Sequence, residues 1–342
     1  MLKGSFASES DTGLPIDFGL DFDVNDDWQI SIGEEDVLRA LQTIKANKSQ
    51  GSDGIKPIFL KLGAFQLCKP LTCLFNRCLQ ERVFPDRWKR ADVCLIPKTN
   101  PPSCDDLRPI SLLPIMSKIF ERLVLKIMRN KLVHSFGSEQ FAYRPHGSTT
   151  NALVAVHDTV TKMLEDPEAA AVRITQFDLS KAFDRLPHRK LIHYLNIGNF
   201  PIGFVLWCKS YLSNRLQRIK IGNLRGKWQP VPCGVPQGSV LGPYLFASFL
   251  GHLHFPSTNH EEIFKYADDI TLIEKNEKTD LSDEMEHNTN KIVSWIKQNG
   301  LKENEKKRNR LLILKKIPLS SSLRSSTTHC LRILGVTWES NL

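Results

Sequence analysis

The sequence predicts an α+β fold, because its segments carry two kinds of apolar repeat. Apolar and polar residues alternate along 264–272, which indicates a strand, a tight turn and a second strand. The apolar run at 172–177 indicates another half-buried strand. Apolar residues at 281, 285, 292 and 296 follow a helical spacing instead, and this helix is expected to end at Gly300, a favourable C-cap.

Aspartates stand where both predicted strands end. Asp268 and Asp269 fall at the tip of the hairpin, and Asp178 follows the strand at 172–177 before a helix begins near Ser180. If the strands are neighbours, Asp178 and Asp268 converge, and carboxylates that close repel one another unless a cation neutralises them. Such oxygen ligands suit Mg²⁺ and two-metal phosphoryl transfer. The alternative for an isolated Asp-Asp pair is an ordinary solvated turn.

A loop rich in glycine and proline precedes a predicted buried helix. Residues 234–243 contain three glycines and two prolines and run into an apolar stretch. Glycine lets the backbone approach a ligand closely, and the start of a helix offers free N–H groups to negative charge. Taken alone, an ordinary loop remains the alternative.

Three segments in this order resemble a known set of motifs. They are FDLSKAFD at 177–184, GVPQGSVLGP at 234–243 and YADD at 266–269, and they resemble motifs A, B and C of reverse transcriptases, specifically those of non-LTR (LINE-type) retrotransposons. The resemblance covers the chain from about residue 30 onward. Further matches are GSDGI at 51–55, the first fingers strand at 88–98, RPISL at 108–112 with Lys118 and Glu121, QFAYR at 140–144 with 148–150, the motif D loop at 304–307 and the primer-grip hairpin at 331–336.

The resemblance implies a right-hand polymerase fold. The fingers would occupy residues 30–170, and the palm would occupy 171–342, with an antiparallel sheet that holds motifs A, C and E against helices. Residues 1–29 are expected to form an acidic linker or a disordered tail. The chain ends six residues after Val336, so the thumb is expected to be largely absent.

The resemblance also implies the catalytic residues. Asp178 and Asp268 would ligate two Mg²⁺ ions, with Mn²⁺ as a substitute. Asp269 would be an adjacent, less essential carboxylate, and the Leu179 carbonyl a further metal ligand. Lys307 would be the general acid for the leaving pyrophosphate, the alternative being a solvated lysine in a run of charges.

Substrate contacts follow from the same motifs. Phe183 would lie beneath the incoming sugar and exclude a 2′-hydroxyl, unless it is simply a core aromatic residue. Lys98 and Arg108 would grip the triphosphate, because ammonium and guanidinium groups both suit phosphate oxygens. Gln237 and Gly238 would lie against the templating base pair and the nucleotide.

The implied function is that of an RNA-directed DNA polymerase. It would extend a DNA primer with deoxynucleotides along an RNA template as part of a retrotransposon. Two positions depart from the family pattern: residues 248–253 replace its usual YINDL segment, which predicts looser packing under the hairpin, and Glu303 stands where an apolar residue is common. One alternative, motivated by the expected lack of a thumb and by the altered segment at 248–253, is a catalytically inactive nucleic-acid-binding remnant of a retroelement. Another is a cellular reverse transcriptase or intron maturase, which the combined motifs disfavour.

Composition agrees with a nucleic-acid-binding protein. Residues 1–28 carry one lysine against seven acidic residues, so the remainder holds +15, the difference between +9 and −6. Eight cysteines without a C-x-x-C pair argue against a zinc knuckle and predict buried thiols in a reducing compartment. No apolar run is long enough for a signal peptide or a membrane span, so we expect an intracellular protein, nuclear or cytoplasmic and not secreted. We also expect a monomer.

Overall fold

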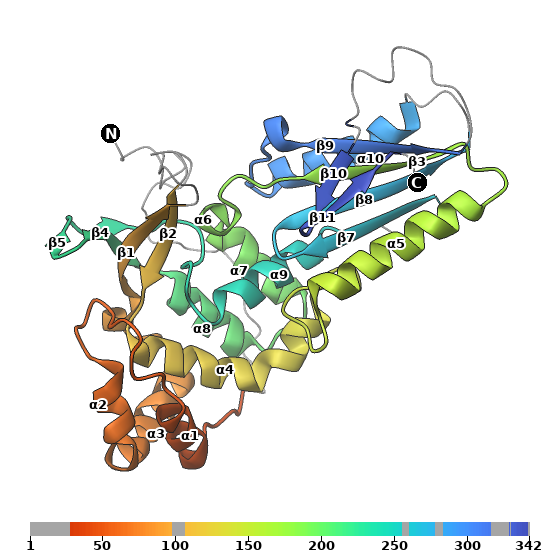
Figure 1. Cartoon of the computed structure of the whole chain (residues 1–342). Coiled ribbons are helices and arrows are strands. Elements are labelled where there is room, and N and C mark those ends of the chain that lie inside the picture. The colour runs from red at the N-terminus through yellow and green to blue at the C-terminus, as the bar shows by residue number, and fades with distance from the viewer. Residues whose placement is uncertain are drawn as a thin grey trace. The chain divides into compact units, whose positions relative to one another are not determined.

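The structure is a computed structural model that describes residues 28–97, 107–254, 260–277, 283–315, 328 and 330–340. Its fold mixes helices and strands, as the sequence predicts (Figure 1). Two compact units each combine two chain segments: unit 1 holds Met1–Leu132 and Phe183–Phe246, and unit 2 holds Val133–Ala182 and Ala247–Leu342. The predicted border between residues 170 and 171 does not coincide with any point at which the chain passes from one unit to the other. The division into fingers and palm stays a prediction.

Unit 2 is built on a four-stranded antiparallel sheet. Its strands lie in the order β7-β8-β3-β9. Their bounds are β7 Glu261–Tyr266, β8 Asp269–Asn276, β3 Ala171–Phe177 and β9 Asn309–Leu314. The central strand β3 is buried along almost its whole length, because helices cover both faces of the sheet.

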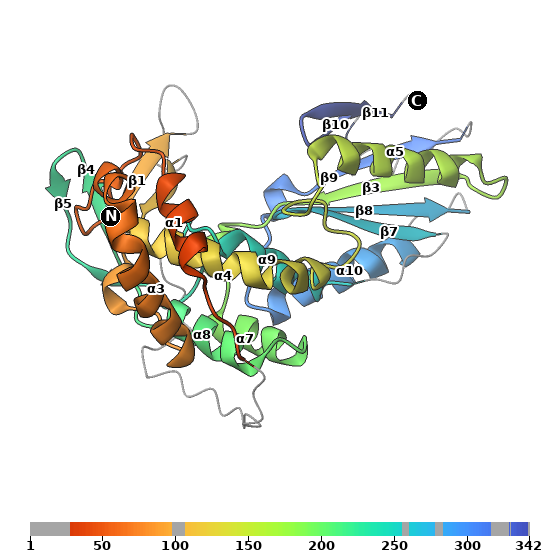
Figure 2. The same cartoon turned by 90° about the horizontal axis from the view of Figure 1, so that it is seen from below.

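Two helices cover opposite faces of this sheet (Figure 2). From α5, Thr149–Glu165, Val156 and Val160 join the same core cluster as Val172 and Ile174 of β3. Alternate residues of a strand point to opposite faces. Arg173 accordingly points the other way, to Thr289 of α10, Asp283–Gln298.

Two predicted features of unit 2 are confirmed. Helix α10 gives way to Gly300, which has a φ of 72° and so takes the left-handed conformation of a helix C-terminus. Residues 331–336 belong to a hairpin of β10, Cys330–Ile333, and β11, Val336–Glu339. Leu334 and Gly335 both have positive φ, as a two-residue hairpin turn requires. Leu281 lies outside the described residues.

The prediction of looser packing at residues 248–253 is wrong. Helix α9, Gly242–Gly251, carries Ser248 and Leu250, and both are buried, as is Leu253. The buried ammonium of Lys265 donates hydrogen bonds to the carbonyls of Leu250, at 3.0 Å, and of Leu253. Burial lowers the pKa of Lys265 to about 8. The segment therefore supports the strand before Asp268 through a lysine that the sequence pattern did not single out.

Unit 1 contains a second sheet, whose strand order is β2-β1-β4-β5 with β6 also paired to β4. Strands β1 and β4 are parallel, and the other pairs are antiparallel. The bounds are β1 Arg90–Pro97, β2 Leu107–Leu112, β4 Leu216–Ile221, β5 Leu224–Arg225 and β6 Gln229–Pro230.

Helices and an aromatic core complete unit 1. The helices include α1 Glu34–Gln42, α2 Pro57–Leu62, α3 Ala64–Gln80, α4 Ile115–His134, α7 His188–Ile197 and α8 Ile202–Leu212. Rings from different segments pack at centroid distances of 4.9 to 5.9 Å, among them Phe75, Phe84, Trp88, Phe120, Trp207 and Tyr211. Such ring pairs add stability beyond the area that they bury.

Cysteine burial corrects one expectation. The seven cysteines in the described ranges are free thiols, and four of them are buried. Cys73 and Cys330 are exposed and Cys94 is half-buried, so the prediction of buried thiols holds only in part. Within the described residues, none of the helices is both long and apolar enough to cross a membrane.

Candidate active site

The turn that carries Asp268 is tight and partly strained. Strands β7 and β8 pair up to Tyr266 and Asp269, which leaves Ala267 and Asp268 as the turn. The prediction is right for Asp268, whereas Asp269, also predicted at the tip, is the first residue of β8. Ala267 has a φ of 56°, a left-handed conformation that costs an L-residue about 1–2 kcal/mol. A specific support must therefore hold it.

The side chain of Gln140 supplies that support. Its Oε1 accepts the Ala267 N–H at 2.9 Å, and its Nε2 donates to the Ala267 carbonyl at 3.2 Å. Gln140 is only 1% exposed, and Oε1 also accepts the Ala142 N–H at 3.0 Å. One neutral amide thus satisfies both backbone groups of the strained residue.

Asp178 and the Asp268–Asp269 turn lie on adjacent strands. The register places Phe177 of β3 opposite Ile270 of β8, so Asp178 and Asp269 are the next residues at this edge of the sheet. Burial, together with the nearby charges of Asp268 and Asp178, raises the pKa of Asp269 to about 6. The three carboxylates therefore share one electrostatic environment with an excess of negative charge.

Residues after α10 hold Asp178 from the other side. Asn304 Nδ2 donates to Asp178 Oδ2 at 3.1 Å, and Lys307 Nζ lies 3.6 Å from the same oxygen. Leu179 is buried and forms an antiparallel bridge with Glu303. Lys307 is thus placed beside a candidate metal ligand. Within the described residues, no group of three or more His, Cys, Asp or Glu side chains that could hold a metal ion is found.

The glycine-rich loop of unit 1 packs against backbone. Gly234 has a φ of 84°, and a Cβ there would come within 2.7 Å of the carbonyl oxygens of Phe183 and Asp184. Gly238 has a φ of 112°, and a Cβ there would lie 2.9 Å from the Ser111 carbonyl oxygen. Both glycines are therefore required by geometry.

Side chains also fix this loop. Gln237 Nε2 donates to Asp184 Oδ1 at 2.9 Å. The buried Glu121 carboxylate accepts the N–H groups of Val240, at 2.8 Å, and Leu241, at 3.1 Å, just before α9 begins. A negative charge at a helix N-terminus is favourable.

Phe183 is half-buried, so it is more than a fully enclosed core residue. Its ring packs on Phe246 with a centroid distance of 4.6 Å. Arg108 is exposed on β2. Lys98 lies outside the described residues.

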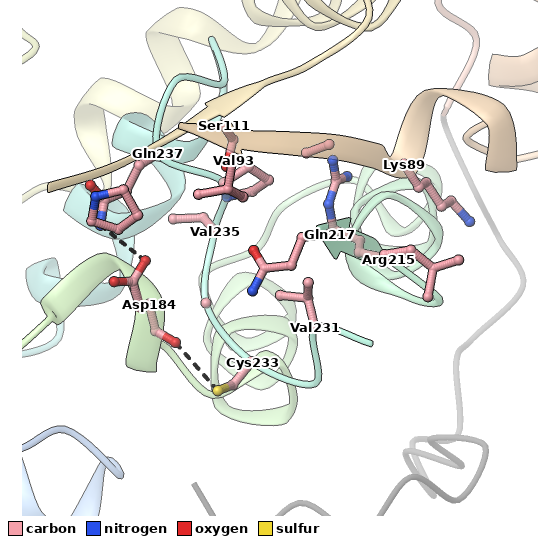
Figure 3. Close-up of a pocket in the computed structure, with 15 residues that line it drawn as sticks. Lys89, Val93, Ser111, Asp184, Arg215, Gln217, Val231, Cys233, Val235 and Gln237 are labelled. Atoms are coloured by element: carbon pink, nitrogen blue, oxygen red, sulfur yellow. Dashed lines mark hydrogen bonds between the residues drawn. The ribbon is translucent and has the colours of Figure 1, made fainter. Parts of the chain in front are cut away.

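A small pocket lies between this loop and the sheet of unit 1 (Figure 3). Its volume of about 30 Å³ is enough for about one water molecule. Arg215 and Gln217 point toward it from the β4 side, and Gln237 and Asp184 lie at its other end. The pocket is too small for a nucleotide.

One face of the same sheet is strongly basic. Cross-strand register places Asp92 beside Arg218, and Lys220 beside Arg225, and residues directly opposite one another share a face. Two residues along β1 from Asp92, Arg90 lies on that face as well. Arg218 donates to the buried Asp92 at 2.7 Å.

Trp228 organises this basic face. The Arg218 guanidinium lies 4.2 Å from the centre of its ring and the Arg90 guanidinium 5.8 Å away. Residues 213–230 contain five lysines and arginines and no acid. We call the group Arg90, Arg108, Arg218, Lys220, Arg225 and Trp228 the basic face.

Sequence reasoning assigned no role to several of these residues. Gln140 and Glu121 were matched only as parts of motifs, and Asn304 only as the start of a loop. Their partners lie about 120 residues or more away along the chain, so a local pattern could not identify them. The register of β3 with β8 confirms that the strand ends of Asp178 and Asp269 are neighbours.

Comparisons with known proteins agree with this arrangement. Residues 96–338 match the family model described as reverse transcriptase (RNA-dependent DNA polymerase). The RNA-directed DNA polymerase from mobile element jockey of Drosophila melanogaster is 32% identical over 70% of this chain and 27% of that protein. The probable RNA-directed DNA polymerase from transposon BS of the same organism is 30% identical over 80% of this chain and 31% of that protein. The chain thus spans less than a third of the length of these relatives.

Solved structures show the fold alone. Apo telomerase from Candida tropicalis, truncated from its C-terminal domain, aligns with a TM-score of 0.55 at 12% identity. The alignment covers 85% of this chain and 62% of that one. Because the family model spans most of the sequence and includes the strand ends and the loop described above, this chain belongs to the reverse transcriptase family, alongside the polymerases of non-LTR retrotransposons.

Proposed function

We propose that this chain is an RNA-directed DNA polymerase that extends the 3′-hydroxyl of a DNA primer with deoxynucleotides along the RNA template of a retrotransposon. The observation that carries the proposal is the meeting of Asp178 with the Asp268–Asp269 turn on adjacent strands. Family membership supports the reaction class. Similarity to the RNA-directed DNA polymerases of jockey and BS supports the choice of template.

The aspartates fit a divalent cation. Asp269 has a raised pKa because it is partly buried beside two other carboxylates, and a bound cation would relieve that repulsion. Asp178 and Asp268 would hold two Mg²⁺ ions, or Mn²⁺, with Asp269 and the Leu179 carbonyl beside them. Substrate phosphates and water would complete the coordination, as Mg²⁺ prefers. When bound, the ions would activate the attacking hydroxyl and stabilise the leaving pyrophosphate.

The motif resemblance assigns substrate contacts to further residues. The half-buried Phe183, which packs on Phe246, would exclude a ribose 2′-hydroxyl. Arg108 and Lys98 would bind the triphosphate, and Gln237 with Gly238 would contact the nascent base pair. Lys307 lies beside Asp178 and would donate a proton to the leaving pyrophosphate.

The basic face would bind the sugar–phosphate backbone of the template. The sheet extends from Arg108 on β2 to Arg225 on β5 across three spacings between neighbouring strands. At the usual strand spacing of about 4.8 Å, this is a span of about 14 Å. Asp92 is the one acidic side chain on the described strands of this sheet. Positive charge therefore exceeds negative charge across the whole width, which favours phosphate binding.

A primer-extension assay tests the proposed activity. A DNA primer annealed to an RNA template is incubated with the chain, deoxynucleotides and Mg²⁺, and Asp268→Asn serves as the inactive control. We expect extension that requires the metal and the deoxynucleotides. A folded protein that binds the RNA but extends no primer with Mg²⁺ or Mn²⁺ would support the inactive-remnant alternative.

A binding assay tests the template surface separately. Replacing Arg90 and Lys220 together by Gln should lower the slope of log Kd against log salt by about 1.4 for single-stranded RNA. The matched control replaces Lys61 and Lys69, exposed lysines of the helices α2 and α3, by Gln. Equal slopes for the two double variants would remove the basic face from the proposal.

A further inference from the structure

Residues 301–308, which we call the clamp segment, hold the backbone on both sides of Leu179, the residue directly after Asp178. The Asn304 N–H donates to the Asp178 carbonyl at 2.8 Å, and the Ser180 N–H donates to the Lys302 carbonyl at 2.8 Å. These two hydrogen bonds form an antiparallel bridge between Leu179 and Glu303. The position of Asp178 therefore depends on the conformation of the clamp segment.

Side chains of the clamp segment also select one oxygen of Asp178. Asn304 Nδ2 and Lys307 Nζ approach the same atom, Oδ2, at 3.1 and 3.6 Å. No described residue makes a hydrogen bond or an ion pair with Oδ1. The carboxylate is thus oriented so that Oδ1 stays available to an incoming ligand.

An ion pair closes the clamp segment on itself. Arg308 donates from Nε and Nη2 to the two carboxylate oxygens of Glu303, at 2.6 Å each. The Glu303 side chain is 4% exposed and that of Arg308 21%. Between them runs the single 3-10 turn Glu305–Lys307, and the Arg308 guanidinium lies 5.7 Å from the ring centre of Phe177, the residue before Asp178.

This pair explains an anomaly in the sequence. Glu303 stands where the family pattern favours an apolar residue, and the structure shows that its charge is compensated by Arg308 five residues later. A buried ion pair is often no more stabilising than apolar residues of similar volume, so stability alone does not account for it. Its geometry does restrict the turn that carries Asn304 and Lys307.

We propose that the Glu303–Arg308 pair is a positioning latch that holds Asn304 and Lys307 on Asp178 Oδ2 and so orients Oδ1 toward the metal and the incoming triphosphate. The proposal rests on the proposed polymerase function for its purpose. The latch itself consists of contacts within the protein and requires no substrate.

Three variants of the whole chain test the latch. Glu303→Gln and Arg308→Lys each weaken the bidentate ion pair. Arg308→Lys keeps the positive charge and is used if Glu303→Gln does not fold. The double variant Glu303→Leu with Arg308→Met keeps apolar volume but has no ion pair. Glu81→Gln is the matched control, because Glu81 also pairs with an arginine, Arg77 at 2.7 Å, and belongs to unit 1.

Hydrogen exchange gives a readout that needs neither metal nor nucleic acid. We expect the Ser180 and Asn304 amides to exchange at least tenfold faster in all three latch variants, and at the wild-type rate in Glu81→Gln. Wild-type exchange in the double apolar variant would overturn the proposal, because the pair would then only compensate buried charge.

Metal binding gives a second readout. Mn²⁺ affinity, measured by electron paramagnetic resonance without nucleic acid, should fall about 10–100-fold in the latch variants, as is typical when residues that orient metal ligands are lost. Unchanged affinity in all of them would also overturn the proposal. If the wild-type chain binds no Mn²⁺ and extends no primer, the proposed function fails, whereas hydrogen exchange still decides whether the latch exists.

Discussion

Asp268 lies in the turn before β8 and Asp178 directly follows the neighbouring strand β3, but contacts of different chemistry hold them. The turn before Asp268 depends on the neutral amide of Gln140, which satisfies a strained alanine. Asp178 depends on an ammonium, an amide and a buried ion pair. Charged groups thus take part in the support of Asp178 but not in that of Ala267. The hydrogen bonds to Ala267 should therefore depend little on salt, while the ion pairs around Asp178 should weaken as salt rises.

The largest expected effect tests whether the two aspartates share one role. Asp178→Asn and Asp268→Asn each remove a metal ligand while preserving side-chain shape, so both should abolish primer extension and leave RNA binding unchanged. Extension and RNA affinity are measured for each purified variant. If only one of the two variants lost extension, the aspartates would not be equivalent ligands of one two-metal centre.

A smaller effect is expected from the neutral support. Gln140→Ala leaves the buried N–H and C=O of Ala267 without their partner, which should cost about 1–3 kcal/mol of unfolding free energy. Extension should fall about 10–100-fold, because the turn that orients Asp268 loosens. Urea unfolding and single-turnover incorporation measure the two effects, with the exposed Gln298→Ala as the matched control.

Relief of backbone strain sharpens this prediction. Adding Ala267→Gly to Gln140→Ala should restore about 1 kcal/mol, because glycine adopts positive φ without steric cost. The losses of unfolding free energy and of extension in Gln140→Ala should be the same at low and high salt, since the amide of Gln140 is uncharged. A strong salt dependence of the Gln140→Ala effect would break the distinction between the two supports.

Phe183→Ala changes neither support and so tests whether substrate choice is independent of them. Loss of the ring should admit ribonucleotides, because only its bulk opposes the 2′-hydroxyl, while the Mg²⁺ dependence of extension stays unchanged. Single-turnover incorporation of matched ribo- and deoxynucleotides measures the selectivity. Wild-type selectivity would make Phe183 a packing partner of Phe246 with no role in sugar choice.

The smallest expected effect is a dependence of stability on pH. The pKa of Asp269 is raised from 3.8 to about 6, so between these values the native state binds more protons than the unfolded state. Stability without metal should therefore fall as pH rises through this window and stay lower above it. Asp269→Asn should then have a higher Tm than wild type at neutral pH and an equal Tm near the lower end of the window.

Thermal unfolding in a metal chelator measures this difference, and saturating Mg²⁺ should reduce it. The same Tm difference at both pH values would mean that the substitution acts through packing. It would also remove repulsion among the three carboxylates as a feature of the site.

Local patterns predicted the parts of the fold that depend on local physics. The hairpin at Asp268, the strand before Asp178 and the helix end at Gly300 follow from apolar spacing and glycine conformation, which neighbouring residues determine. The supports could not be predicted in this way. Gln140 and the turn that it holds are 127 residues apart, and Asn304 and Asp178 are 126 residues apart, so only the folded chain brings them together.

Departures from the family pattern were misjudged for the same reason. A changed segment at 248–253 predicted looser packing, but Lys265 donates to two of its carbonyls. Glu303 stands where an apolar residue is common, but Arg308 pairs with it. In both cases the compensating cation lies outside the segment that changed, and its contact exists only in three dimensions.

The parallel pairing of β1 with β4 has a consequence for synthesis on the ribosome. Asp92 and its partner Arg218 are 126 residues apart. The ribosome adds about 5–20 residues per second, so β4 is synthesised roughly 6–25 s after β1. During that interval the β1 edge that will pair with β4 has no partner, and unpaired strand edges recruit other chains. Nascent chains stalled between these strands should therefore be the most aggregation-prone, and chaperone demand should peak before residue 216 emerges.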